Sequence, residues 1–157
     1  MRAGLTNLLL LGICGFLGGC TTTGSGPVAI TKVNPYHLQS GPIVKTEDAM
    51  IEFEQRRHLY GAVDAAERRE LYGNYFTIFW KTETRNPVTV RFEYRQGSTG
   101  LQIHTKEVEV VSPKRQNTTK FEVRGDDYHK NGKVTQWRAS IIENGVVVAE
   151  YKSYLWQ

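Results

Sequence analysis

The sequence of 157 residues predicts a mainly β protein: an antiparallel β-sandwich of immunoglobulin-like or fibronectin-like kind, with one short helix. Six or seven segments in its second half have the alternating or aromatic pattern of strands. Turn signals separate them, among them Asn86-Pro87 and Asn144-Gly145. A small closed barrel is the alternative, because it is built from the same short strands.

Residues 1–19 are typical of a bacterial export signal. Met1-Arg2 supplies a positive start, and residues 5–17 are mostly apolar. A membrane-spanning helix needs about 20 predominantly apolar residues, whereas this run is shorter and polar residues follow it from Thr21. We therefore expect an N-terminal signal helix that is removed on export.

Leu17-Gly18-Gly19-Cys20 resembles the lipobox of bacterial lipoprotein signal peptides, in which an aliphatic residue and two small residues precede a cysteine. Gly18 departs slightly from the usual Ala or Ser. The resemblance implies cleavage before Cys20, a diacylglyceryl group on its thiol, and a further acyl chain such as palmitate on its amino group. Several acyl chains give stable anchoring, so the resemblance implies a lipid-anchored protein of the cell membrane. In a Gram-negative cell, Thr21 in place of aspartate implies the outer membrane.

Residues 20–45 predict a flexible linker between the lipidated cysteine and a folded domain at 46–157. This stretch is rich in Gly, Thr, Ser and Pro, with breaks at Gly26-Pro27, Asn34-Pro35 and Gly41-Pro42. Roughly 25 residues at about 3.3 Å each reach on the order of 80 Å when fully extended. We therefore expect the domain to stand well off the bilayer.

The segment 46–62 fits two structures. Thr46-Glu47-Asp48-Ala49 is a possible helix cap, whereas Ile51 and Phe53 also fit one side of a polar strand. The next element is clearer, because Asp64 followed three residues later by Glu67 fits a capping box, and Gly73 fits a stop. These residues predict a short helix between them.

Strand signals fill the rest of the chain. Val88, Val90, Phe92 and Tyr94 alternate with polar residues, the pattern of a strand with one buried face. The apolar phase slips within 101–111, which predicts a bulge there. The expected strands are 75–80, 88–94, 101–111, 119–123, 136–141 and 147–155. The aromatic residues expected in the core include Phe79, Phe92, Phe121 and Trp137.

Composition and charge point to no particular catalytic or ligand-binding activity. The formal net charge is +4, of which Arg2 lies in the signal, and basic residues at 56–57 and 68–69 are interleaved with glutamates. This pattern predicts solvated surface and no nucleic-acid partner. The histidines, His37, His58, His104 and His129, lack ligand-spaced partners. The sequence therefore predicts no metal site, no cofactor and no catalytic residue.

The segment 125–132 superficially resembles a calcium loop, with Asp127, His129 and Asn131 before a glycine. Histidine is a poor ligand for a hard cation, and Arg138 stands where the loop needs a bidentate glutamate. We therefore expect a polar hairpin loop.

The last predicted strand provides the candidate binding surface. Tyr154 and Trp156 share the parity of Glu150 and Lys152, which is the outward face if Tyr151 and its alternating neighbours face inward. The alternative is that segment 46–62 covers this strand.

The sequence as a whole predicts a membrane-anchored cell-envelope lipoprotein that acts as a non-enzymatic protein-interaction module. The alternative is a carbohydrate- or peptidoglycan-binding module, in which Tyr154 and Trp156 stack on sugars and Arg91 and Arg95 are polar partners. An enzyme whose residues assemble only in the folded state is a third possibility. The expected partners are the membrane, through the anchor, and an envelope protein or a glycan.

Overall fold

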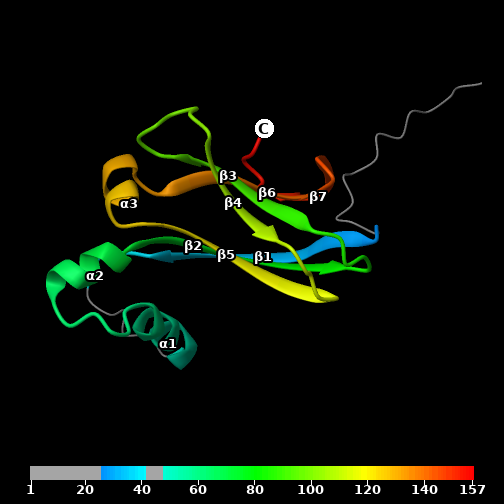
Figure 1. Ribbon diagram of the computed structural model, residues 1–157. Helices are drawn as coiled ribbons and strands as arrows, with labels where there is room; N and C mark the ends of the chain where they lie inside the picture. Colours follow the sequence, from blue (N-terminus) through cyan, green and yellow to red (C-terminus); the bar gives the residue numbers. More distant parts are fainter. Residues whose placement is uncertain (1–25, 42–47) are drawn as a thin grey trace, which may run out of the picture.

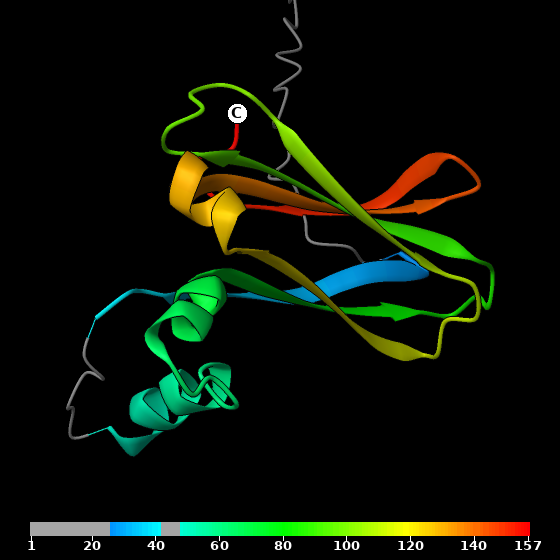
Figure 2. The same ribbon diagram turned by 60° about the vertical axis from the view of Figure 1, so that its left-hand side comes forward.

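The computed structural model describes residues 26–41 and 48–157 and confirms the antiparallel β-sandwich. Two sheets lie face to face as two layers (Figures 1 and 2). The first sheet has the order β1-β2-β5, and the second has the order β4-β3-β6-β7. The strands are β1 (Val28–Leu38), β2 (Gly73–Thr82), β3 (Val88–Gln96), β4 (His104–Val110), β5 (Gln116–Arg124), β6 (Val134–Glu143) and β7 (Val146–Lys152).

Buried and more exposed residues alternate along the strands, and the buried ones form the core between the sheets. The predicted apolar face of β3 is buried, and Phe92 at its centre is fully inaccessible. Its ring lies 4.5 Å from that of Phe76 and 5.2 Å from that of Phe121, so aromatic side chains of both sheets interlock. Phe121 is confirmed as a core residue and Trp137 packs at the core's margin. Phe79 differs from the prediction, because it lies half-buried on the outer face of the first sheet.

The predicted linker over 20–45 is wrong for residues 28–38. These residues form β1, which pairs with β2 along its whole length and buries Val28, Ile30 and Val33 in the core. Two features hid this strand. A register shift between Ile30 and Lys32 breaks the alternation, and Pro35 is tolerated because β1 is an edge strand. The predicted signal segment and Cys20 lie outside the described residues.

Three helices are present in the described part of the chain, two more than predicted: α1 (Ala49–His58), α2 (Ala65–Leu71) and α3 (Asp126–Asn131). Helix α1 settles the open choice at 46–62, since the Asp48 side chain accepts a hydrogen bond from the Met50 N–H. The capping box of Asp64 and Glu67 is confirmed at the start of α2. Helix α3 lies where a polar loop was expected. Within the described ranges, no helix is long and apolar enough to cross a membrane.

Two strand boundaries also differ from the prediction. Residues 101–103 precede β4, so the phase slip marks the start of the strand, and a bulge is not needed to explain it. β7 ends at Lys152, three residues before the predicted end. The hairpin at Asn144-Gly145 is confirmed, with positive φ angles of 51° and 78° at the two turn residues.

Lys106 links the two sheets on the side where the edge strands β4 and β5 lie. Lys106 of β4 is paired with Phe92 in the register, and its Nζ donates a hydrogen bond to the backbone oxygen of Glu122 on β5, at 2.6 Å. Both β4 and β5 are edge strands. The Lys106 ammonium group thus occupies a backbone acceptor at a sheet edge.

Candidate functional site

A groove of about 740 Å³ separates α1 from the outer face of the first sheet. Helix α1 lies on the side of this sheet that faces away from the second sheet (Figures 1 and 2). Glu54, Arg57 and His58 form the helix wall of the groove. The sheet side is lined by outward residues of three strands, among them Tyr36 of β1, Tyr75, Thr77 and Phe79 of β2, and Thr118, Lys120 and Glu122 of β5.

His58 attaches α1 to the sheet. Its ring lies 4.7 Å from the ring of Tyr36, nearly parallel to it, and 4.3 Å from the ring of Tyr75. Tyr36 and Tyr75 are cross-strand partners of β1 and β2, so the histidine ring packs against an aromatic pair. The Glu54 carboxylate lies 3.8 Å from His58 Nε2. The end of α1 is therefore fixed by packed rings and one carboxylate.

Burial controls the ionisation of this cluster. Burial lowers the pKa of His58, and the Glu54 carboxylate opposes that shift. Burial also raises the pKa of Tyr36, and it raises the pKa of Tyr75 to about 12. The Tyr75 hydroxyl donates a hydrogen bond to the backbone oxygen of Leu71, at the end of α2. At neutral pH the ring cluster is therefore uncharged.

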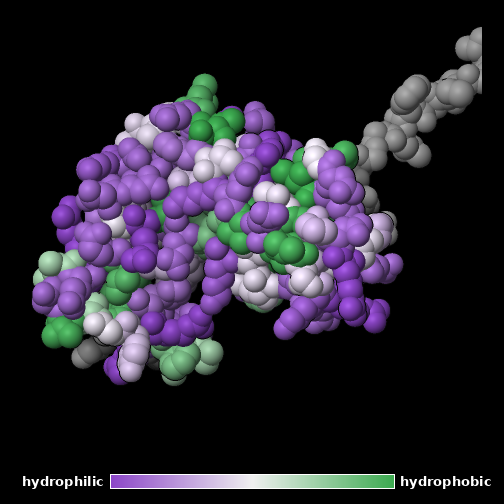
Figure 3. All heavy atoms as spheres, in the orientation of Figure 1, coloured by the Kyte–Doolittle hydropathy of each residue, from purple (hydrophilic) through white to green (hydrophobic). Residues whose placement is uncertain are grey.

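Helix α1 leaves three large apolar side chains exposed. Met50 is 65% exposed, Ile51 51% and Phe53 57%. Helical spacing places Met50 on the same stripe as Glu54 and Arg57, so apolar surface continues the helix wall of the groove. Hydrophobic side chains are visible over α1 at the lower edge of the molecule (Figure 3). The one indication of this surface in the sequence is the apolar pair Ile51 and Phe53, which also fitted a strand.

The predicted surface on the second sheet is only partly present. Tyr154 is 99% exposed, as predicted, but Trp156 is 6% exposed and the prediction that it faces solvent is wrong. Its ring lies 5.0 Å from the guanidinium carbon of Arg95 and 5.2 Å from that of Arg138. Arg91 is on the same outer face, where it forms an ion pair with Glu107 at 2.6 Å.

The reason for the difference at Trp156 lies in the residues after β7. The chain leaves the strand at Ser153, whose Oγ accepts a hydrogen bond from the Trp137 N–H. A turn follows, in which the Trp156 N–H donates to the Ser153 oxygen at 3.0 Å. Beyond Lys152 the side chains no longer alternate between the two faces of a strand, and the indole folds back over the sheet. The described part of segment 46–62, residues 48–62, does not cover this strand, because α1 packs on the first sheet.

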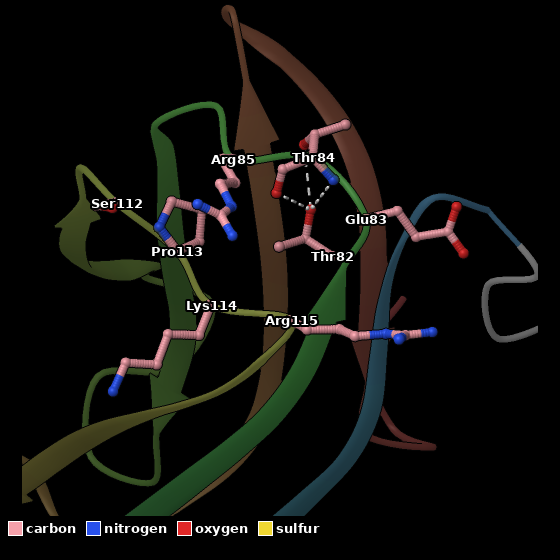
Figure 4. Close-up of a pocket in the computed structure, with 8 residues that line it drawn as sticks. All are labelled: Thr82, Glu83, Thr84, Arg85, Ser112, Pro113, Lys114 and Arg115. Carbon is pink, nitrogen blue, oxygen red and sulfur yellow. Dashed lines mark hydrogen bonds between the residues drawn. The ribbon is translucent and has the colours of Figure 1, made fainter.

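A second hollow, of about 650 Å³, lies at the end of the sandwich where β1 begins. It is lined by Thr82 at the end of β2, by residues 83–85 that follow it, and by residues 112–115, before β5 (Figure 4). Arg85, Lys114 and Arg115 are exposed here. Thr82 Oγ1 donates to the Thr84 oxygen at 3.0 Å, which fixes the turn after β2.

The other histidines have structural contacts. His37 is hydrogen-bonded to the Tyr128 hydroxyl at 2.7 Å, His104 stacks on Tyr94, and His129 is bonded to the backbone of Arg69. Among residues 26–41 and 48–157, no group of three or more His, Cys, Asp or Glu side chains is arranged to hold a metal ion.

Comparison with known proteins provides no relative from which a function can be read. No protein-family model matches the chain, and no curated protein matches it. Among solved structures, the beta-D-glucoside glucohydrolase from Trichoderma reesei is weakly similar, at 12% sequence identity and a TM-score of 0.36. The similar region covers 80% of this chain but only 18% of that enzyme. A similarity this weak supports no inference about the present chain.

Proposed function

We propose that this chain is a non-enzymatic lipoprotein of the cell envelope, anchored to a membrane by lipid on Cys20, that binds an amphipathic segment of a partner protein. The anchor rests on the lipobox resemblance at residues 17–20 and on the apolar run before it. The binding site is the groove beside α1.

The exposed apolar surface of α1 carries the proposal. Met50, Ile51 and Phe53 are each more than half exposed, and they lie on a single ten-residue helix beside a groove. Burying one such side chain is worth about 1.5–3 kcal/mol. Exposed apolar residues scattered singly need no explanation, but a cluster beside a groove is typical of an interaction site. A partner that covers this helix gains the hydrophobic free energy of burying side chains that stay exposed in the folded domain.

The charges around the groove favour a protein segment. Both signs are present, from Arg57 and Lys120 on one hand and from Glu54 and Glu122 on the other. Mixed charge at the margin of an apolar surface suits a segment with an apolar face and charged flanks of both signs. A polyanion would meet repulsion from the two carboxylates.

The same geometry makes the carbohydrate alternative weaker. Sugar stacking needs a free aromatic face, but the tyrosines that line the groove, Tyr36 and Tyr75, both pack against His58. Phe53 and Tyr60 are exposed but do not line the groove. Trp156, the platform expected from the sequence, is covered by Arg95 and Arg138. Tyr154 remains exposed after the end of β7, and it stacks on no other ring among the described residues.

Photocrosslinking in the native host tests the proposal. A photoreactive phenylalanine replaces Phe53 in one strain and Leu101, which is 81% exposed in the loop before β4, in the matched control. We expect a discrete crosslinked protein from position 53 and not from position 101.

Binding of the captured partner is then measured with purified proteins. Phe53→Asp is expected to weaken binding by at least tenfold, because about 1.5–3 kcal/mol of apolar burial is lost. Leu101→Asp is expected to leave binding unchanged. Equal crosslinking from both positions, or equal affinity of the two variants, would overturn the proposed site.

A further inference from the structure

We infer that the end of the sandwich formed by residues 83–87 and 111–115 is a docking surface for anionic lipid headgroups, which holds the domain upright on its membrane. This inference rests on the proposed lipid anchor, and it adds an orientation that the anchor alone does not supply.

The two connections meet beside the first residues of β1. The Thr82 N–H donates to the Arg115 oxygen at 3.1 Å, and the Glu83 N–H donates to the Pro27 oxygen at 2.8 Å. The start of β1, the β2–β3 connection and the β4–β5 connection therefore form one surface (Figures 1 and 4). Helix α2 and the end of β1 lie at the opposite end of the sandwich.

This surface has an excess of positive charge. Arg85, Lys114 and Arg115 are exposed, and none of the three lies within ion-pair distance of a carboxylate in the described part of the chain. Glu83 is the one acidic residue of the two connections. The neighbouring Glu143 accepts a hydrogen bond from Thr84 Oγ1 at 2.9 Å. The two connections therefore carry a net charge of about two, and the adjacent Glu143 carboxylate, which a hydroxyl hydrogen bond does not neutralise, reduces the local excess to about one.

The three cations do not converge on one point. Lys114 and Arg115 are adjacent in the β4–β5 connection and point to opposite sides, while Arg85 lies across from them near Pro113 (Figure 4). A pocket for a single phosphate needs donors aimed at a common centre. Diverging cations instead suit a plane of many headgroups, so the arrangement favours a membrane surface over a small anion.

The length of chain before β1 directs this end toward the bilayer. Val28 follows Cys20 by eight residues, which span at most about 29 Å when fully extended. The sequence-based expectation was on the order of 80 Å, because residues 28–38 were assigned to the linker. A ten-residue strand such as β2 is itself about 33 Å long. The surface beside β1 therefore stays within about 29 Å of the lipid, whereas the opposite end of the domain can lie farther away.

Exposed valines at the same end fit the headgroup layer. Val111 is 67% exposed at the start of the β4–β5 connection. Val146 and Val147, at 64% and 51%, begin β7 directly after the hairpin, and the partner of Val146 is Glu143. Apolar side chains among basic residues are the composition of surfaces that lie in a membrane interface.

The test uses the lipidated protein in vesicles. A fluorophore is attached at Ser112→Cys, on the proposed surface, or at Ser40→Cys, after the end of β1; the sequence has no other cysteine after Cys20. The vesicles contain phosphatidylcholine alone or with phosphatidylglycerol, together with a headgroup spin-labelled lipid as the quencher. Mass spectrometry of Cys20 first establishes that the anchor is present.

On anionic vesicles at low ionic strength we expect strong quenching at residue 112 and weak quenching at residue 40. Each unit of net positive charge near an anionic surface contributes about fivefold, so a net charge of one to two favours the docked orientation by about 5-fold to 25-fold over neutral vesicles. Arg85→Gln/Lys114→Gln/Arg115→Gln is expected to remove this dependence on lipid charge. Arg56→Gln/Arg68→Gln/Lys130→Gln, with the same change in net charge at the helical end, is expected to retain it.

The outcomes separate this inference from the proposed anchor. If Cys20 carries no lipid, the anchor and the orientation that depends on it both fall. If Cys20 is lipidated but residues 112 and 40 are quenched equally, or the two triple variants behave alike, the anchor stands and the docking surface alone is overturned.

Discussion

Replacing Trp156 with alanine tests whether the residues after β7 are part of the folded domain. The indole is 6% exposed and lies over the guanidinium groups of Arg95 and Arg138. If the indole projected into solvent, as strand parity predicted, the substitution would change the free energy of unfolding by no more than about 0.5 kcal/mol. The structure predicts a much larger loss.

The size of that loss follows from the packing. Truncating a buried tryptophan to alanine costs about 3–5 kcal/mol, and the lower figure applies because Trp156 covers the outside of one sheet. One effect opposes the loss. Arg95 Nε is buried and has no hydrogen-bond partner in the described part of the chain, and access to water relieves a penalty of about 1 kcal/mol. We expect a net loss of about 2–3 kcal/mol.

Urea denaturation followed by far-ultraviolet circular dichroism measures the loss without relying on tryptophan fluorescence. Tyr154→Ala is the matched control, because Tyr154 is 99% exposed and two residues away; its effect is expected to stay within about 0.5 kcal/mol. A double-mutant cycle of Trp156→Ala with Arg138→Ala is expected to show a coupling of about 0.5–1 kcal/mol. Equal effects of Trp156→Ala and Tyr154→Ala would refute the packed position of the indole.

Two further predictions concern the helices beside the first sheet. Because burial lowers the pKa of His58 in the folded chain, the unfolded chain binds more protons near its ordinary pKa of about 6.5, and stability is lost as the pH falls below that value. Urea titrations from pH 7 to pH 5 should show a smaller loss in His58→Gln, and His37→Gln should reduce the loss as well, since burial lowers the pKa of His37 too. An unchanged slope in the His58 variant would contradict the stacked geometry. Asp64→Ala should cost about 1 kcal/mol in the same titration because its side chain caps α2. Asp64→Asn, which keeps an acceptor oxygen, should cost less, and equal losses would contradict a capping role.

The sequence predicted the strands whose side chains alternate without interruption. The alternation at 88–94 became β3 because one face of that strand packs in the core and the other faces solvent. Asn144-Gly145 was equally informative, since the two positive φ angles of its turn suit these residue types. In both places the local pattern is sufficient to determine the structure.

Elements that depend on distant residues were not predictable in this way. β1 has the composition of a linker and acquires its order from ten residues of β2 far along the chain. The groove beside α1 requires His58 to meet Tyr36 and Tyr75, which lie 22 and 17 residues from it in the sequence. No periodicity marks such a contact. Likewise, the position of Trp156 depends on a turn that ends strand parity at Lys152.

The hydrogen bond from Lys106 to the Glu122 backbone carbonyl protects a strand edge when copies of the domain are crowded together. Copies held on a membrane, as proposed, meet at far higher local concentration than copies free in solution, and open strand edges then promote fibre growth. A charged lysine at the margin between β4 and β5 makes a foreign strand displace an ammonium group before it can pair. Crowded copies, such as the proposed anchor would produce, are thus hindered from adding strands along that margin.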